Sequence, residues 1–223
     1  KEKFLKEFNS NLVKKLSKNF ENKRYDLTNN SGISNFKTNI KKSSRFKFSK
    51  IENFNYFEPD LISDGKNFIF FDDKGTIFKF NDNFKIIWKK NFYTKQEKKL
   101  NPILTFANNG KLLIVFDNIS KYYAVDLQTG ELIWSKTNTN PSNSQIKVLN
   151  ERIYSIDLNN ILKCFSIDDG SEIWNFKSEN TFLKSTKRNS LIIKDDIVYI
   201  NNSLGDISAI NANDGSLIWQ LPT

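Results

Sequence analysis

The chain of 223 residues contains no histidine and a single cysteine. Without histidine, the commonest general base is missing, and His-based catalytic triads and His-containing zinc sites are excluded within these residues. The lone Cys164 can form no disulfide within the chain and leaves the redox compartment open. No apolar run is long enough to span a bilayer, and the hydrophobic content of 38% fits a folded domain.

Methionine is also absent, even at position 1, and the sequence ends at Pro222-Thr223 directly after a repeat. These two observations lead us to expect a piece of a longer or processed protein. No signal peptide is visible in this stretch, although an incomplete N-terminus would hide one.

Four tryptophans are present, and each ends a similar phrase. The clearest copy runs from Ala124 to Trp134, and successive tryptophans are 46, 40 and 45 residues apart. A period of about 40–45 residues is the length of a four-stranded propeller blade. The copy that ends at Trp88 lacks the glycine of the others and is one residue shorter. The motif positions are Trp88, Ala124, Asp126, Gly130, Trp134, Gly170, Trp174, Ala209, Gly215 and Trp219.

Each motif position has a physical interpretation. The glycine four residues before tryptophan fits a tight turn, because glycine adopts positive φ without steric cost. The short polar residue eight before tryptophan, such as Asp126, can bond nearby backbone amides and fix that turn. Apolar and polar residues alternate on both sides, as in half-buried strands. Each phrase is therefore predicted to be a hairpin whose last strand carries the tryptophan.

A second group of β-branched and aromatic strands precedes each hairpin and follows a polar turn such as Asp64-Gly65 or Asn109-Gly110. Together these features give four strands in each period. The predicted fold is all-β: a β-propeller of four-stranded antiparallel blades, of which about four are present as a partial ring. The predicted blades cover residues 57–92, 101–137, 144–177 and 188–221. We interpret the tryptophans as contacts that lock neighbouring blades, rather than as a substrate-stacking site.

The positive charge is concentrated ahead of the predicted propeller. Residues 1–50 carry a net charge of +10, whereas residues 51–223 carry −1. The propeller therefore lacks the basic face that nucleic-acid binding needs. The segment 1–50 is either an amphipathic helix on anionic lipid or an extended tail from an upstream anchor, and both would associate the protein with a membrane. A strand at 36–40 could complete the last blade of a closed ring.

The phrase Ala-x-Asp-x-x-Thr-Gly-x-x-x-Trp resembles the tryptophan-docking motif of PQQ-like β-propeller repeats over residues 57–221. The resemblance implies an eight-bladed ring and points to two branches. One contains the BamB-like envelope lipoproteins, non-enzymatic scaffolds for outer-membrane β-barrel assembly at the periplasmic face of the outer membrane. The other contains the PQQ-dependent quinoprotein dehydrogenases, which carry a vicinal disulfide, a calcium site and an aspartate base.

The sequence favours the scaffold branch, with protein partners in the outer-membrane assembly machinery. It contains no Cys-Cys pair, no glycine-rich phosphate loop and no carboxylate spacing that specifies calcium. Most acidic residues fall at predicted turns, and Cys164 occupies the small-residue position of Ala124 and Ala209, which predicts a core residue. We therefore assign no catalytic, cofactor-binding or metal-binding residue. The alternatives are a dehydrogenase whose cofactor residues lie elsewhere, or a sensor propeller fused to another domain.

Overall fold

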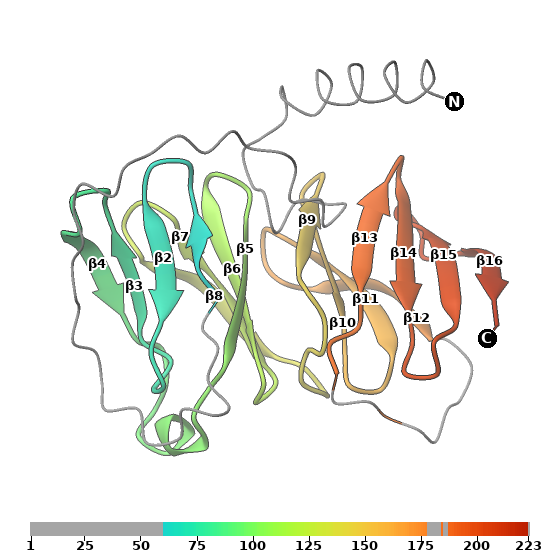
Figure 1. The fold of residues 1–223 in the computed structure, drawn as a ribbon, viewed down its shortest axis with the longest axis horizontal. Coiled ribbons are helices and arrows are strands. Elements are labelled where there is room, and N and C mark those ends of the chain that lie inside the picture. The colour runs from blue at the N-terminus through green and yellow to red at the C-terminus, as the bar shows by residue number, and fades with distance from the viewer. Residues whose placement is uncertain (1–59, 178–183, 185–186, 223) are drawn as a thin grey trace, which may run out of the picture.

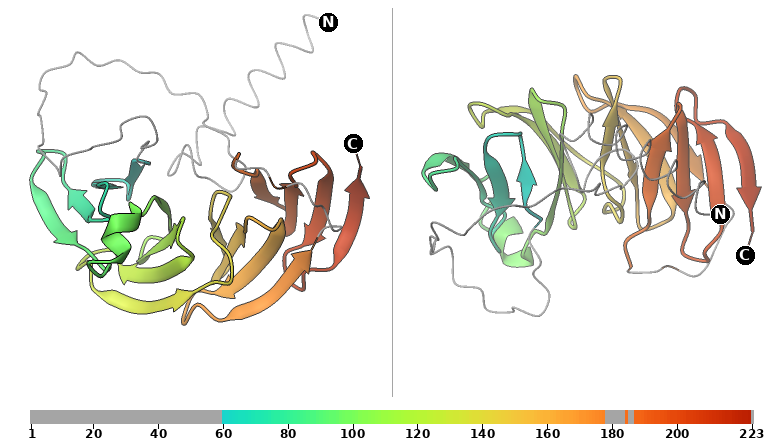
Figure 2. Two further views of the ribbon diagram at one scale, coloured as in Figure 1. Left: turned by 90° about the horizontal axis from the view of Figure 1, so that it is seen from below. Right: turned by 45° about the horizontal axis from the view of Figure 1, so that its top comes forward.

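The computed structural model describes residues 60–177, 184 and 187–222, and within them four antiparallel sheets of four strands each. The sheets stand side by side along an arc, and the strands follow the chain order within each sheet (Figures 1 and 2). This arrangement is a partial β-propeller and confirms the predicted fold class. The predictions for residues 1–50, including the strand at 36–40, lie outside the described residues.

The four blades have the following strands. Blade 1 comprises β1 (Ile62–Ser63), β2 (Phe68–Phe71), β3 (Ile77–Phe80) and β4 (Ile86–Lys90). Blade 2 comprises β5 (Leu104–Asn108), β6 (Leu112–Asp117), β7 (Lys121–Asp126) and β8 (Leu132–Thr137). Blade 3 comprises β9 (Lys147–Leu149), β10 (Arg152–Ile156), β11 (Ile161–Ser166) and β12 (Glu172–Lys177). Blade 4 comprises β13 (Leu191–Lys194), β14 (Ile197–Asn201), β15 (Ile207–Asn211) and β16 (Leu217–Leu221).

The core lies between neighbouring blades. The first strands converge on the inner side of the arc, where β9 contacts both β5 and β13 (Figure 2). The middle strands carry the buried side chains, as in β7, where Tyr122, Tyr123, Ala124 and Val125 are buried. The outer strands are mostly exposed, as in β8. A sheet cannot bury both of its faces alone, so side-by-side stacking supplies the core of each blade.

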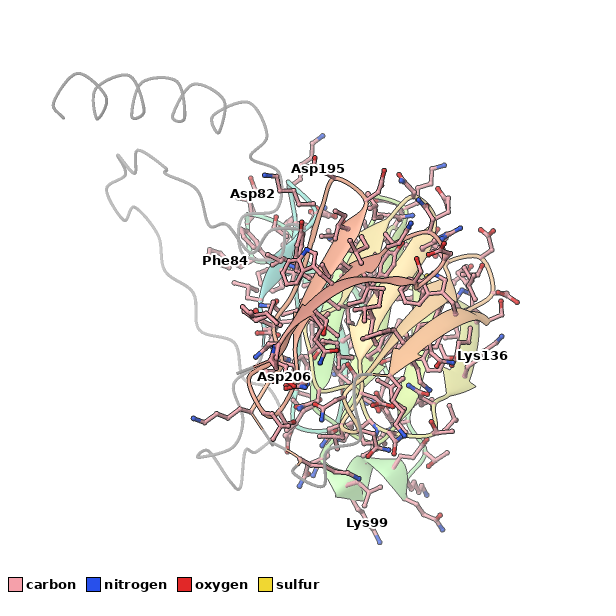
Figure 3. The ribbon with its side chains drawn as sticks, turned by 90° about the vertical axis from the view of Figure 1, so that its right-hand side faces the viewer. Asp82, Phe84, Lys99, Lys136, Asp195 and Asp206 are labelled. Atoms are coloured by element: carbon pink, nitrogen blue, oxygen red, sulfur yellow. The ribbon has the colours of Figure 1, made fainter. Side chains whose placement is uncertain are left out.

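The connections between strands lie at two opposite edges of the blades. Turns between the first and second strands and between the third and fourth strands lie at the upper edge in Figure 1, and the 3-10 helix η2 (Glu97–Leu100) lies at the lower edge. Figure 3 shows Asp195, from a turn of the first kind, at the upper edge and Lys99 of η2 at the lower edge. No helix among the described residues is long and apolar enough to cross a membrane.

Candidate functional site: the inter-blade contacts and an upper-edge hollow

Three tryptophans lie directly against a glycine of the next blade. Trp88 packs on Gly130, Trp134 on Gly170 and Trp174 on Gly215. A Cβ atom added at these glycines would lie 2.6–2.7 Å from the nearest indole atom, closer than real Cβ contacts. The three glycines also have φ between 70° and 76°, a region that other residues adopt with strain. Two separate features therefore require glycine: the positive φ of the backbone and the close contact of the tryptophan indole.

The indole N–H groups point to a second feature of the same turn, a carbonyl three residues before the glycine. Trp88 Nε1 donates to the Leu127 carbonyl at 3.2 Å, and Trp134 Nε1 donates to the Ile167 carbonyl at 2.8 Å. Each junction between these blades thus joins an apolar contact to a hydrogen bond across the blades. Such a hydrogen bond contributes about 1 kcal/mol.

The third junction has different donors. Trp174 Nε1 is buried and has no hydrogen-bond partner among the described residues. The corresponding carbonyl, that of Ala212, instead accepts from the Tyr154 hydroxyl at 3.1 Å and from Arg152 at 3.2 Å. At this junction Trp174 still packs on Gly215, but Tyr154 and Arg152 of blade 3 donate to the carbonyl in its place.

The small and polar motif residues hold the hairpin itself. Ala124 lies opposite Trp134 and Ala209 lies opposite Trp219 in the strand register, and both alanines are fully buried. Asp126 Oδ1 accepts the backbone N–H groups of Gln128 at 2.9 Å and Thr129 at 2.7 Å. The small side chain leaves room for the indole, and the carboxylate fixes the turn that presents the glycine.

Cys164 lies opposite Trp174 in the register, at the position of Ala124 and Ala209, and it is fully buried. Burial raises the pKa of its thiol to about 11, so the thiolate, which is the reactive form, is scarce at neutral pH. These contacts are those of a core residue.

Blade 1 places a charge at the small-residue position, which the sequence did not reveal. Lys79 lies opposite Trp88, is 1% exposed, and donates from Nζ to the Leu127 carbonyl at 2.8 Å. Its ammonium also pairs with Asp64 Oδ2 at 2.7 Å. Burial disfavours the charged form of Asp64, but the bonds from Lys79 and Asn67 outweigh that effect and lower its pKa to about 2. The shorter hairpin of blade 1 hid this alignment, because Lys79 is nine rather than ten residues before its tryptophan.

A further repeated element joins the second and third strands of every blade at the lower edge. In each blade one side-chain oxygen at the end of the second strand accepts hydrogen bonds from the backbone N–H groups two and four residues later. The accepting residues are Asp72, Asp117, Asp157 and Asn202. The residue three positions later has positive φ in all four blades, at Gly75, Ser120, Asn160 and Gly205. The spacing of these Asp/Asn residues, 45, 40 and 45, is a signal that could have identified them.

One of these carboxylates also takes part in a buried network between blades 1 and 2. Asp117, 3% exposed, accepts a hydrogen bond from the Tyr93 hydroxyl at 2.7 Å. Burial raises the pKa of Asp117 and of Tyr93. Lys121 lies over the Tyr93 ring and donates to the Phe92 carbonyl at 2.7 Å. The network positions the segment that leads into η2.

A hollow of about 800 Å³ opens at the upper edge between blades 1 and 2. Its lining is rich in amide side chains, namely Asn67, Asn108, Asn109 and Gln128, and it includes the glycine turns at Gly65 and Gly110. A Cβ atom at either glycine would meet no heavy atom within 4 Å, so the turns face open space. Side-chain amides both donate and accept hydrogen bonds, and here the Oδ1 atoms of Asn108 and Asn109 accept backbone N–H groups of their own turn.

The described acidic side chains do not gather into a metal site. Within residues 60–177, 184 and 187–222, no group of three or more His, Cys, Asp or Glu side chains could hold a metal ion. Asp169 and Asp214 instead bind Ser171 and Ser216 within their own hairpin turns. These contacts, like those of Asp126, fix turns.

Comparisons with known proteins agree with this geometry. The profile of a family described as "Outer membrane protein assembly factor BamB" matches residues 73–223. BamB from Moraxella catarrhalis has a similar structure, with a TM-score of 0.54 and 18% identity, over 72% of this chain and 50% of that one. The quinohemoprotein alcohol dehydrogenase ADHIIG from Pseudomonas putida HK5 has a TM-score of 0.55 and 17% identity, over 74% of this chain and 33% of that one.

At these identities the two solved structures show the fold alone. The chain spans half of the Moraxella protein and one third of the dehydrogenase. No curated protein sequence matches it. The profile, however, covers more than half of the chain and includes every glycine on which a tryptophan packs. The chain therefore belongs to the family of PQQ-like β-propeller repeat proteins described as the outer-membrane protein assembly factor BamB.

Proposed function

We propose that the protein is a non-enzymatic scaffold of the bacterial cell envelope that binds protein partners during assembly of outer-membrane β-barrel proteins. The observation that carries this proposal is the family match over residues 73–223. The proposed location is the periplasmic face of the outer membrane, and the proposed partners are components of the assembly machinery. Both rest on the resemblance to the BamB-like branch, since the matching family is described as an outer-membrane protein assembly factor.

The geometry supports docking at the upper edge. The inter-blade contacts of Trp88 and Lys79 hold blades 1 and 2 together beneath the hollow. The hollow is thus a preformed, polar concavity between two fixed turns, and loops on a rigid scaffold are common binding surfaces. Gln128 is exposed at its rim. We assign this hollow as the docking site.

The dehydrogenase alternative finds little support in the donor groups of the described residues. Asp72, Asp117 and Asp157 each commit one carboxylate oxygen to two backbone N–H groups. The chain has one cysteine, so the vicinal disulfide of that branch cannot form within these residues. We assign none of the described residues to a quinone or its cation, and we derive no reaction step from them.

The proposal can be tested by deleting the gene in its own bacterium and measuring the amount of folded outer-membrane β-barrel proteins. We expect that amount to fall and to be restored by the wild-type gene. A Gln128→Arg variant, which places a bulky charge at the hollow, should fail to restore it. The matched control is Gln96→Arg, an exposed glutamine at the lower edge, which should restore it fully.

Two outcomes would contradict the proposal. If deletion leaves the folded barrel proteins unchanged, the assembly role is wrong. If purified full-length protein reduces an electron-acceptor dye only with added PQQ and calcium, the protein is an enzyme. Restoration by both arginine variants would instead retain the role and reject the hollow as its docking site.

A further inference from the structure

The turn between β5 and β6 contains the only Asn-Gly dipeptide of the chain, Asn109-Gly110. Both residues are exposed, and the turn lies at the upper edge of blade 2, where it lines the hollow (Figure 1). A Cβ atom at Gly110 would meet no heavy atom within 4 Å. Gly110 therefore presents its backbone nitrogen to the Asn109 side chain with neither a Cβ atom nor crowding at the Cβ position.

The hydrogen bonds of this turn surround the side-chain carbonyl of Asn109 as an oxyanion site would. Asn109 Oδ1 accepts the backbone N–H groups of Lys111 at 3.0 Å and of Leu112 at 2.8 Å. Attack of a nucleophile on Asn109 Cγ moves negative charge onto this oxygen, and two N–H donors stabilise that charge. The Gly110 N–H donates to Asn108 Oδ1 at 3.2 Å, the long limit for such a bond. The carbonyl is thus activated while the neighbouring N–H group is weakly held.

We propose that Asn109 is a modification site at which the folded protein deamidates spontaneously. The Gly110 nitrogen loses its proton to solvent and bonds to Asn109 Cγ. The Cγ–Nδ2 bond breaks, and Nδ2 takes up a proton and leaves as ammonia, so that a five-membered succinimide ring remains. Water then opens the ring. Attack of water on Cγ gives aspartate, and attack on the main-chain carbonyl carbon of residue 109 gives isoaspartate, in which the chain continues through Cγ.

The corresponding turn of blade 1 has the same backbone hydrogen bonds but begins with an acid. Asp64 Oδ1 accepts the N–H groups of Lys66 at 3.1 Å and of Asn67 at 2.7 Å. Its carboxylate pairs through Oδ2 with the buried Lys79 at 2.7 Å, and a charged carboxylate is a poor electrophile. This turn should therefore not form a ring at neutral pH. It also shows that aspartate, one product of the reaction, fits the first position of such a turn.

A carboxylate at position 109 would lack the lysine that Asp64 has. Ala124 lies opposite Trp134 in blade 2, as Lys79 lies opposite Trp88 in blade 1, so an alanine stands where the lysine would be. Deamidation would therefore make the lining of the hollow more negative as the protein ages. The isoaspartate product would in addition lengthen the main chain of the turn by one carbon atom.

Other asparagines of the described chain are protected by burial. Asn143, Asn189 and Asn202 each precede a serine, which is also small, and all three asparagines are buried. A buried site must open locally before its backbone can rearrange into the ring, and that opening slows the reaction. Conversion at Asn109 should exceed conversion at each of these three by at least about tenfold.

The experiment incubates the full chain at neutral and at mildly alkaline pH. Peptide mass spectrometry follows each asparagine, and an isoaspartyl methyltransferase assay detects isoaspartate. Asn109 should convert first, to aspartate and isoaspartate together. Its rate should rise about tenfold for each pH unit, because loss of the Gly110 proton precedes the attack. Gly110→Ala should slow the conversion by at least about tenfold, because the added methyl group crowds the attacking nitrogen.

The matched control is Gly65→Ala in the turn of blade 1. Gly65 has φ of 93°, close to the 86° of Gly110, and its Cβ position is equally open, so both variants carry similar backbone strain. Conversion at Asn109 should be unchanged in this control, and circular dichroism establishes that each variant stays folded. The proposal is overturned if Asn109 keeps its amide in the folded chain, or if Gly65→Ala slows conversion as much as Gly110→Ala. Aspartate without isoaspartate would also overturn it, because water would then have hydrolysed the amide directly.

Discussion

Replacing Gly170 with alanine tests whether the tryptophan–glycine contact holds blades 2 and 3 together. The new Cβ would lie 2.6 Å from Trp134 Cζ3, so the indole must move. Moving it also stretches the 2.8 Å bond from Trp134 Nε1 to the Ile167 carbonyl. The φ of 70° adds about 1–2 kcal/mol of backbone strain for alanine. With the hydrogen bond and the displaced ring, the expected loss of unfolding free energy is about 3–5 kcal/mol.

The matched control is Gly110→Ala. Gly110 has a similar φ of 86°, but a Cβ there meets no heavy atom within 4 Å, so only the backbone strain applies. Urea denaturation followed by tryptophan fluorescence gives both free energies. The Gly170 variant should be less stable than the Gly110 variant by about 2–3 kcal/mol, or roughly 4–12 °C in melting temperature. Equal losses in the two variants would refute the inter-blade contact as a source of stability.

Three further perturbations have defined outcomes. Trp134→Ala should lower the unfolding free energy by about 3–5 kcal/mol in urea titration, whereas substitution of the exposed Trp219 by alanine should lower it by less than about 1 kcal/mol. Similar losses in the two variants would contradict the interpretation that Trp134 locks blades 2 and 3 together. The folded pKa of Asp64, about 2, lies below its ordinary value of 3.8, so its carboxylate contributes stability above about pH 4 that is lost as pH falls through 2. The stability advantage of wild type over Asp64→Asn should thus shrink by about 2 kcal/mol between pH 4 and pH 2, measured by thermal melting at each pH; a constant difference would show that the carboxylate does not prefer its charged form. Ser120→Gly should raise the unfolding free energy by about 0.5 kcal/mol, because φ of 75° strains serine there and glycine holds that position in blades 1 and 4.

The repeat was readable from sequence because its signals are local. The hairpin glycine needs positive φ, and the tryptophan recurs at the same distance from it, so both requirements act within one hairpin. The polar turns at Asp64-Gly65 and Asn109-Gly110 were equally visible, and both glycines do have positive φ. Turn chemistry and strand alternation therefore predicted four strands in each period and the propeller fold.

The sequence predicted that the tryptophans lock neighbouring blades, but it did not reveal the contacts of Lys79 or the hollow, because these depend on which side chains meet between blades. The partner of Lys79 in the next blade, the Leu127 carbonyl, is 48 residues away along the chain. The hollow likewise combines turns near Gly65, Gly110 and Gln128. No local pattern shows that these turns meet, nor that a lysine would replace alanine beneath Trp88. Spacing identifies the repeated unit, and only the stacked structure shows how the units differ.

The differences between junctions separate the required part of the lock from the adaptable part. The carbonyl three residues before the glycine accepts from tryptophan and lysine at Leu127, from tryptophan at Ile167, and from tyrosine and arginine at Ala212. The donors vary because any side chain that reaches the carbonyl satisfies it. The glycine cannot vary in this way, because the indole leaves no space for a Cβ atom. Steric fit therefore fixes the tryptophan–glycine pair, while hydrogen bonding around it is free to diverge from blade to blade.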